Sequence, residues 1–205
     1  MKKIMFFVIL TFSLATGFVY SKTINVKPGD NIQSAVNKAT SGDTIILKSG
    51  AHIIKTNLEI KSKSNLSIKG EKGAKIICDN TDSPVISIYS SKDINISNIF
   101  ATHKEPEKVQ YACAGSVIEI SECSGIINIT NCDLNGCGTI GVAVYSANIV
   151  NIKDCFIHNN SDSGVTGYEA KQISVENSIL VNNNGKPFVE EGKTKINKKN
   201  NIIKN

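Results

Sequence analysis

The segment between Ala101 and Gly115, ATHKEPEKVQYACAG, gathers titratable side chains in a chain that is otherwise rich in Asn. Lys104 and Lys108 lie four residues apart, and Glu105 lies between them. A Lys with a lowered pKa can act as a general base, and a second positive group can stabilise the charge that develops when a proton leaves a carbon next to a carboxylate. These three residues are candidate catalytic residues, although the same composition is typical of a solvated surface loop.

Tyrosines recur at one phase of an alternating apolar pattern. If the alternating Ile and Val residues point inward, Tyr89, Ser121, Tyr145 and Tyr168 fall in one outward column. Aromatic rings present apolar faces with a polar tip and can stack on sugar rings, so the three tyrosines are candidate substrate-binding residues. The alternative is that Tyr simply favours the surfaces of strands.

An internal repeat defines the elements that would hold these side chains. The segments GIINITNCDLNG, NIVNIKDCFIHN, KQISVENSILVN and KTKINKKNNIIKN align with one another, and similar segments begin at Asn65 and Asp93 with longer spacers. Three aligned columns keep a spacing of 23 residues: Ile127, Val150, Ile173 and Ile196; Asn131, Asp154, Asn177 and Asn200; Leu134, Ile157, Leu180 and Ile203.

Each repeat contains short apolar alternations that break at Asn, Asp, Gly or Ser, which is strand periodicity. A strand of this length cannot bury its apolar side alone, but stacking each copy on the next forms a continuous core and pairs the backbone donors. The repeat therefore predicts a solenoid of parallel strands. About six coils at ~4.8 Å per coil would give a rod about 30 Å long.

The opening segment INVKPGDNIQSAVNKATSGDTIILKSG predicts an amphipathic helix followed by a buried strand. Asp30 is a suitable N-cap, Gln33 can complete a capping box, and Gly42 ends the segment. A helix laid across the open end of stacked strands covers core and unpaired edges, so we expect an N-terminal cap. The apolar stripe of the helix is Ile32, Ala35, Val36 and Ala39.

Residues 1–21 have the pattern of a secretory signal peptide: Lys2 and Lys3, then a mostly apolar run, then small residues near Ser21. A single membrane anchor is the alternative, but the apolar run is short and no stop-transfer segment follows it. We predict cleavage near Ser21, a secreted or periplasmic protein, and no transmembrane segment after cleavage.

The rest of the chain has the length of one domain and contains no Pro-rich or Gly/Ser-rich linker. We predict one solenoid domain over residues 22–205, with the cap at 22–43 and the coils at 44–205. All 23 basic residues are Lys, and 18 acidic residues leave a net charge of +5. This balance does not indicate a nucleic-acid partner, but it permits attraction to acidic glycans.

The repeats and the opening segment resemble the right-handed parallel β-helix proteins of the pectate-lyase-like superfamily, over essentially all of residues 22–205. The opening is similar to the start of members related to chondroitinase B and the alginate lyases. The resemblance implies an all-β fold, namely a single-stranded right-handed parallel β-helix (solenoid) of about six coils with an N-terminal capping α-helix. It also implies that functional side chains lie on the outside of one sheet.

The resemblance assigns a structural role to the polar column. In such proteins, stacked Asn side chains at a turn link neighbouring coils through amide hydrogen bonds, which implies a structural ladder of Asn131, Asp154, Asn177 and Asn200. The alternative is a row of Ca²⁺ ligands. Because only Asp154 is charged, the ladder is the preferred interpretation.

Six cysteines occur in a chain that we expect to leave the cytoplasm. Cys132 and Cys155 share a repeat position and are interpreted as stacked buried thiols, since inward side chains of adjacent parallel strands are poorly placed for bridging. Cys113 and Cys137 precede successive coils and are the candidate disulfide. No Cys-x₂-Cys pair is present and the histidines are far apart in the repeat, so we predict no metal site.

The sequence leaves the activity open. Pectate-lyase-like enzymes commonly use an Arg to stabilise charge, but this chain has no Arg, and paired carboxylate motifs of a related hydrolase family have no counterpart. We therefore expect a non-catalytic carbohydrate-binding or envelope-associated scaffold without a cofactor. One alternative is a small polysaccharide lyase, for which we would expect Ca²⁺, or another carbohydrate-active enzyme acting on acidic glycans. The other is a structural protein that docks through its last coil.

Overall fold

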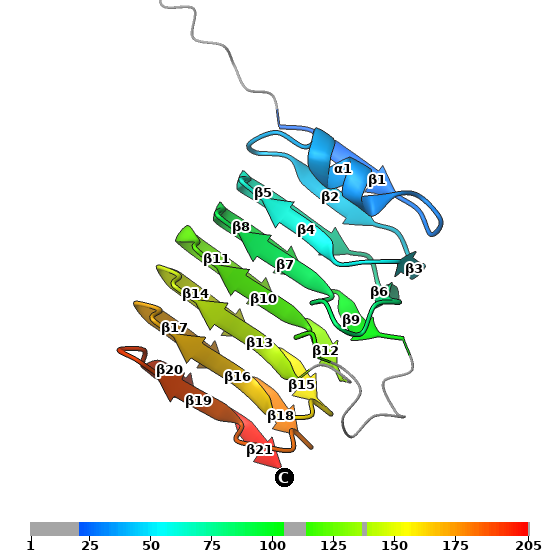
Figure 1. Ribbon diagram of the computed structural model, residues 1–205. Coiled ribbons are helices and arrows are strands. Elements are labelled where there is room, and N and C mark those ends of the chain that lie inside the picture. The colour runs from blue at the N-terminus through cyan, green and yellow to red at the C-terminus, as the bar shows by residue number, and fades with distance from the viewer. Residues whose placement is uncertain (1–20, 105–113, 137–138, 205) are drawn as a thin grey trace, which may run out of the picture.

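The computed structural model describes residues 21–104, 114–136 and 139–204. The chain winds repeatedly through three parallel sheets, which we name sheets A, B and C in chain order (Figure 1). Sheet A contains β1 (Thr23–Val26), β2 (Thr44–Leu47), β5 (Ser64–Gly70), β8 (Lys92–Ser97), β11 (Ser124–Thr130), β14 (Ile149–Lys153), β17 (Gln172–Glu176) and β20 (Ile196–Lys199).

The other two sheets complete each coil. Sheet B contains β3 (Gly50–Ile54), β6 (Ala74–Cys78), β9 (Phe100–His103), β12 (Asp133–Asn135), β15 (Phe156–His158), β18 (Ile179–Val181) and β21 (Ile202–Lys204). Sheet C contains β4 (Leu58–Lys61), β7 (Ile86–Tyr89), β10 (Ile118–Ser121), β13 (Ile140–Tyr145), β16 (Ser163–Tyr168) and β19 (Phe188–Glu191).

The predicted parallel solenoid is confirmed, and it has about seven turns instead of about six. The difference arises at the N-terminal end, where the segment expected to serve only as a cap also supplies a strand. β1 pairs in parallel with β2, so that Thr23 lies opposite Thr44. The cap therefore contributes to the first turn as well as covering it.

Strand register reproduces the 23-residue repeat. Ile127, Val150, Ile173 and Ile196 are successive register partners in sheet A, and Leu134, Ile157, Leu180 and Ile203 are successive partners in sheet B. The first of these columns is buried throughout, whereas in the second Ile203 of the last coil is 46% exposed. Burying an aliphatic side chain of this size stabilises a fold by roughly 1.5–3 kcal/mol, so the stacked columns form the main apolar core.

The turn from sheet A to sheet B explains why Asn and Asp recur there. Asn98, Asn131, Asp154, Asn177 and Asn200 all have φ between 51° and 58°, in the left-handed region. Asn and Asp tolerate this conformation better than other residues with a side chain. The backbone of the turn therefore selects these residue types independently of any ligand.

A second row of amides runs along the outer face of sheet A. Asn128 Nδ2 donates to Asn95 Oδ1 at 2.8 Å, and Asn151 Nδ2 donates to Asn128 Oδ1 at 3.0 Å. The three residues are register partners, and each is the first residue of its motif in the sequence, NIS, NIT and NIK. Side-chain hydrogen bonds thus reinforce the backbone ladder between three consecutive coils.

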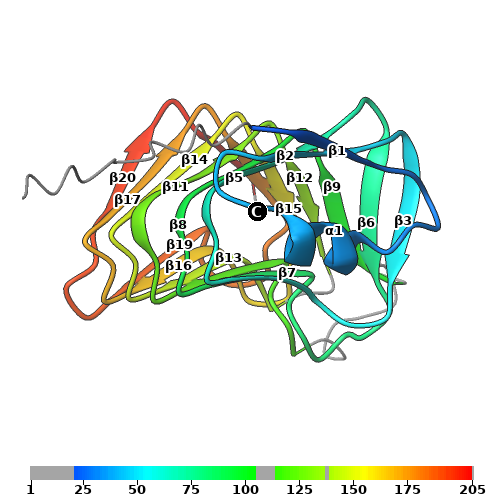
Figure 2. The same cartoon turned by 90° about the horizontal axis from the view of Figure 1, so that it is seen from above.

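The predicted capping helix is present as α1 (Ile32–Lys38), and Figure 2 shows it lying across the end of the coils. Its N-cap is Asn31, not Asp30, because the carboxylate of Asp30 accepts the backbone N–H of Lys27 at 2.8 Å. The helix ends at Lys38, before Gly42, since Ala39 already has an extended conformation. The predicted helix is therefore present, but it has Asn31 instead of Asp30 as its N-cap and it ends at Lys38, before Gly42.

Gln33 does not close a capping box but pairs with the edge of sheet C. Its Nε2 donates to the carbonyl of Glu59 at 2.9 Å, and its Oε1 accepts the N–H of Glu59 at 2.8 Å. The amide therefore occupies the place that a neighbouring strand would take beside β4. Lys63 Nζ secures the other end of α1 by donating to the carbonyls of Asn37 and Ala39.

Within the described residues, no helix is both long enough and apolar enough to span a membrane. Nearly all of the predicted signal peptide lies outside the described residues.

The amide of Gln33 offers a test of this edge protection. Gln33→Ala removes both hydrogen bonds to Glu59, and we expect the free energy of unfolding to fall by about 1–2 kcal/mol, since each such bond contributes ~0.5–1.5 kcal/mol. Urea denaturation followed by circular dichroism measures this loss. Lys38→Ala, at an exposed position of the same helix, serves as control and should change the value by less than about 0.5 kcal/mol. Equal losses in the two variants would contradict the proposed role of Gln33.

Candidate functional site

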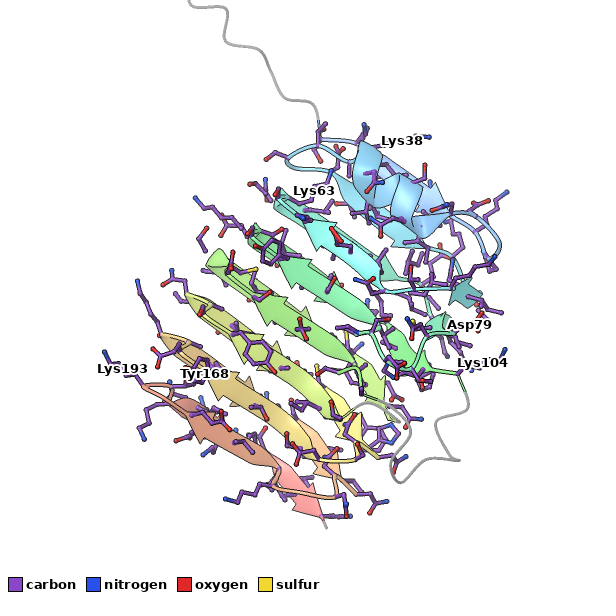
Figure 3. All side chains as sticks on the ribbon, in the orientation of Figure 1. Lys38, Lys63, Asp79, Lys104, Tyr168 and Lys193 are labelled. Carbon is purple, nitrogen blue, oxygen red and sulfur yellow. The ribbon has the colours of Figure 1, made fainter. Side chains whose placement is uncertain are left out.

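The tyrosines selected from the sequence lie on the outer side of sheet C. Strand register aligns Tyr89 with Ser121, Ser121 with Tyr145, and Tyr145 with Tyr168, so the four residues form one row across β7, β10, β13 and β16. Figure 3 labels Tyr168, which is 45% exposed, while the other two tyrosines are half-buried. We call this row the tyrosine column.

Charged side chains extend the tyrosine column at both ends. Lys61 of β4 is the register partner of Tyr89, and its Nζ lies 5.4 Å from the centre of the Tyr89 ring. At the other end, Glu191 of β19 is the partner of Tyr168. The row thus runs over six strands from a cation, through aromatic and hydroxyl groups, to a carboxylate.

A second outward row lies two residues earlier in each strand and contains Ser87, Glu119, Ala143 and Thr166. Ala143 and Thr166 are buried in spite of their outward position, and Glu119 is half-buried. The sequence analysis did not single out Glu119. The available signal was its place in VIEIS, where an acidic residue alternates with isoleucines that point into the core.

The surroundings of Glu119 favour its neutral form. Burial raises the pKa of the Glu119 carboxyl. Burial also raises the pKa of Tyr145, with further contributions from the charges of Glu119 and Glu191. The Tyr145 hydroxyl therefore keeps its proton at neutral pH and can donate a hydrogen bond. A half-buried carboxyl with a raised pKa, close enough to Tyr145 to affect the pKa of its hydroxyl, is a candidate functional group.

The candidate catalytic residues do not join this row. Lys104 directly follows β9 and forms an ion pair with Asp79 at 3.6 Å, in an exposed position that Figure 3 labels. It precedes the strand of sheet C in its coil, whereas the tyrosine column lies at the last residues of those strands. Glu105 and Lys108 lie outside the described residues.

The polar column at the A–B turn makes amide contacts between coils. Asn131 Nδ2 donates to Asn98 Oδ1 at 2.8 Å, and Asn200 Nδ2 donates to Asn177 Oδ1 at 3.3 Å. Asp154 occupies the place between Asn131 and Asn177 in the repeat. The row thus extends one coil further towards the N-terminus than the sequence analysis proposed, to Asn98.

Cys132 and Cys155 are free thiols, and both are buried. The backbone N–H of Cys155 donates to Ser178 Oγ at 3.1 Å, which places the hydroxyl next in the same inward stack. Cys113 and Cys137, the candidate disulfide, lie outside the described residues. No group of three or more His, Cys, Asp or Glu side chains that could hold a metal ion occurs in the part of the chain that the structure describes.

The outer face of sheet B carries a polar pair formed by His158 and Asp133. His158 Nε2 lies 2.8 Å from Asp133 Oδ1, and Asn159 Nδ2 lies 3.0 Å from His158 Nδ1. The imidazole stacks on Phe156 with ring centres 3.9 Å apart. Both ring nitrogens of His158 have a hydrogen-bond partner. His158 therefore orients the carboxylate of Asp133 and does not present a free base.

The pKa of Glu119 gives a pH-dependent prediction. A raised folded-state pKa stabilises the protein below the unfolded pKa of about 4.3, and this contribution is lost as the pH rises through the folded pKa. Glu119→Gln should therefore be more stable than the parent protein at neutral pH, and the difference should vanish below about pH 4. Urea denaturation across this range measures the effect. Glu59→Gln, an exposed change in the same outward row, should not reproduce it; a constant difference at all pH values would contradict the assignment.

Comparison with known proteins places the fold. No protein-family model matches the chain, and no curated protein matches it. Among solved structures, a candidate glycosyl hydrolase from Parabacteroides merdae is similar over 84% of this chain and 88% of its own, with a TM-score of 0.65 and 16% identity.

Two pectin methylesterases are also similar. One, solved in complex with a hexasaccharide, matches 90% of this chain and 66% of its own, with a TM-score of 0.64 and 17% identity. The other, from Erwinia chrysanthemi, matches 80% of this chain and 55% of its own, with a TM-score of 0.57 and 18% identity. At these identities the likeness is one of fold alone, and the fold that this chain shares with them is the parallel β-helix.

Proposed function

We propose that the protein is an exported, non-catalytic module that binds an extended glycan along the tyrosine column. The observation that carries this proposal is the register of sheet C, which sets Tyr145 and Tyr168 side by side on adjacent strands, with Tyr89 two strands away. Neighbouring strands are ~4.8 Å apart, so the rings form a periodic row that a chain of sugar rings can follow.

The chemistry of the row suits a polyhydroxylated ligand. The rings offer apolar faces, the protonated hydroxyl of Tyr145 offers a donor, and Ser121 between the tyrosines can donate or accept. The pectin methylesterase of similar fold that was solved with a hexasaccharide supports the idea that such a β-helix can hold an oligosaccharide.

Export is part of the same proposal. A glycan of the cell envelope or the surroundings is available only to a protein that leaves the cytoplasm, which agrees with the leader pattern in residues 1–21. N-terminal sequencing of the protein recovered outside the cytoplasm should show a start near residue 22. Recovery of the uncleaved chain from the cytoplasm would contradict it.

The tyrosine column predicts the effect of removing its rings. Tyr145→Ala combined with Tyr168→Ala should weaken glycan binding at least tenfold. Stacking of a sugar ring on a tyrosine ring, with the apolar area that it buries, contributes on the order of 1 kcal/mol per tyrosine. Isothermal titration with oligosaccharides measures the dissociation constants. Ile126→Ala is the control, because it removes an exposed apolar side chain from sheet A, away from the tyrosine column. Unchanged binding in the double variant would refute the stacking role and favour a purely structural protein.

One observation favours a second candidate function, a carbohydrate-active enzyme. Glu119 combines a raised pKa with a position on the outward face of sheet C, two residues before Ser121 of the tyrosine column. Burial that raises the pKa of a carboxyl extends the pH range over which it keeps its proton, which is a property required of a general acid. In this function Glu119 would replace the lysines selected from the sequence, of which Lys104 lies apart from the row.

Incubation with acidic polysaccharides, with and without Ca²⁺, distinguishes the two functions. The binding module should release no unsaturated uronate ends, detected by ultraviolet absorbance, and no reducing ends. Release that disappears in Glu119→Gln would establish the enzyme and refute the non-catalytic proposal. Release that persists in Glu119→Gln and disappears in Lys104→Ala would instead return the catalytic role to the lysine.

A further inference from the structure

The corner between sheets A and B is hollowed in the early coils of the solenoid, around Gly70 and Asn98. Two cavities of about 630 Å³ and about 500 Å³ meet there and share Gly70, Lys72 and Asn98 in their walls. Their volumes lie within the range of small-ligand sites. We call the combined hollow the corner groove. Its residues belong to sheets A and B and the turns between them, whereas the tyrosine column is on sheet C.

A break in the repeat creates the corner groove. Five residues separate Lys69 from Lys75, whereas only two separate their register partners, Ser97 and Phe100. The longer turn stands out from the coil and forms a step above the shorter one. Gly70 occupies the start of this turn, where a Cβ would lie 2.2 Å from the carbonyl oxygen of Asn98, so no side chain can fill the step.

The same break leaves an amide donor in the groove. Asn98 Oδ1 accepts the hydrogen bond from Asn131, and the amide row would continue from Asn98 Nδ2 to the coil above. That coil has Gly70 at the equivalent position, which offers no side-chain acceptor. Among the residues that the structure describes, no hydrogen-bond acceptor pairs with Asn98 Nδ2. A half-buried donor at the wall of a cavity is suited to a ligand oxygen.

Lysines dominate the charge of the corner groove. Lys48, Lys69, Lys72 and Lys75 line it, against two carboxylates, Glu71 and Asp133. Lys48 Nζ lies 2.6 Å from Glu71 Oε1, and this hydrogen bond holds the pKa of Glu71 below its usual range, so this pair stays ionised and neutral as a unit. Lys69 and Lys72 have no carboxylate partner within the described residues. The groove therefore favours an anionic ligand.

The remaining wall distinguishes a saccharide from a simple anion. Phe100 presents a ring beside Lys75, whose Nζ lies 5.4 Å from the ring centre. Asp133, oriented by His158, adds a hydrogen-bond acceptor that a sugar hydroxyl can use but that an anion without an O–H group, such as sulfate, cannot. Cations, an amide donor, an acceptor and an aromatic ring are thus present together.

We infer that the corner groove is a second binding site, which takes an acidic saccharide bearing carboxylate or sulfate groups. Lys69, Lys72 and Lys75 bind the anionic groups, and Asn98 Nδ2 donates to a ligand oxygen. The inference shares the ligand class of the proposed function, but it does not depend on the tyrosine column.

Titration of the full mature chain with defined tetrasaccharides tests the corner groove. Tetragalacturonate carries carboxylates, a chondroitin sulfate tetrasaccharide adds sulfates, and maltotetraose is neutral. The combined change Lys69→Gln, Lys72→Gln and Lys75→Gln should weaken binding of an acidic probe at least tenfold and leave maltotetraose unaffected. Its matched control, Lys153→Gln, Lys171→Gln and Lys193→Gln, removes the same charge from exposed positions elsewhere and should change binding less than threefold.

The side-chain amide signal of Asn98 gives a local readout. Acidic probes should shift this signal in a ¹⁵N-correlated NMR spectrum, and Asn98→Gly, which suits the left-handed backbone at φ 58°, identifies it by its loss. Equal weakening by the two lysine triples, an unmoved Asn98 signal, or no binding of either acidic probe would overturn the inference.

The two sites fail separately. If the tyrosine double variant loses binding and the groove triple does not, the corner groove is refuted and the tyrosine column stands. The reverse result supports the corner groove and refutes the proposed function of the column.

Discussion

Register between successive coils is the constraint on which the rest of the structure depends. Every strand among the described residues pairs in parallel with the strand one turn away, and a shift by one residue would turn each buried column to the solvent. The aliphatic columns of sheets A and B prevent such a shift because they are buried on one face only. In a solenoid held in this way each added coil contacts only the coil next to it.

Two kinds of surface follow from this constraint. Where the repeat is regular, side chains of equal phase stand in rows at the spacing of strands, as in the tyrosine column and in the amide row of Asn95, Asn128 and Asn151. Where the repeat is broken, the coil changes its outline. The turn that begins at Gly70 is the clearest break in the A–B corner, and the cavities lie there. Regular rows suit periodic ligands, whereas breaks form individual pockets.

Polar groups at the ends of rows have a particular character. Inside a row, an amide such as that of Asn128 donates to one neighbour and accepts from the other, so both ends of its side chain are held by the protein. At an end, one donor or acceptor has no partner, as for Asn98 beside Gly70. At the edge of sheet C the same difficulty is met by Gln33, whose side chain replaces the missing strand. Ends are therefore either covered, as at α1, or available for binding.

The sequence by itself determined the type of fold and the phase of the core, because apolar side chains that recur every 23 residues must stack when the strands between them pair in register. It also determined the tyrosine column, because alternation within each strand places the tyrosines opposite in phase to the buried Ile and Val residues. It also predicted the capping helix, but not its first residue, since Asp30 and Asn31 are equally good caps until the turn from Lys27 uses the carboxylate of Asp30.

The tertiary structure alone decided which polar groups became buried, paired or left without a partner. The desolvation of Glu119, the pairing of Gln33 with Glu59, which is 26 positions away, and the free amide of Asn98 beside Gly70 each depend on residues of another coil or on the offset between two turns of unequal length. A periodic pattern specifies what repeats, whereas these features occur where the repeat stops, and only the stacked coils show which groups meet there.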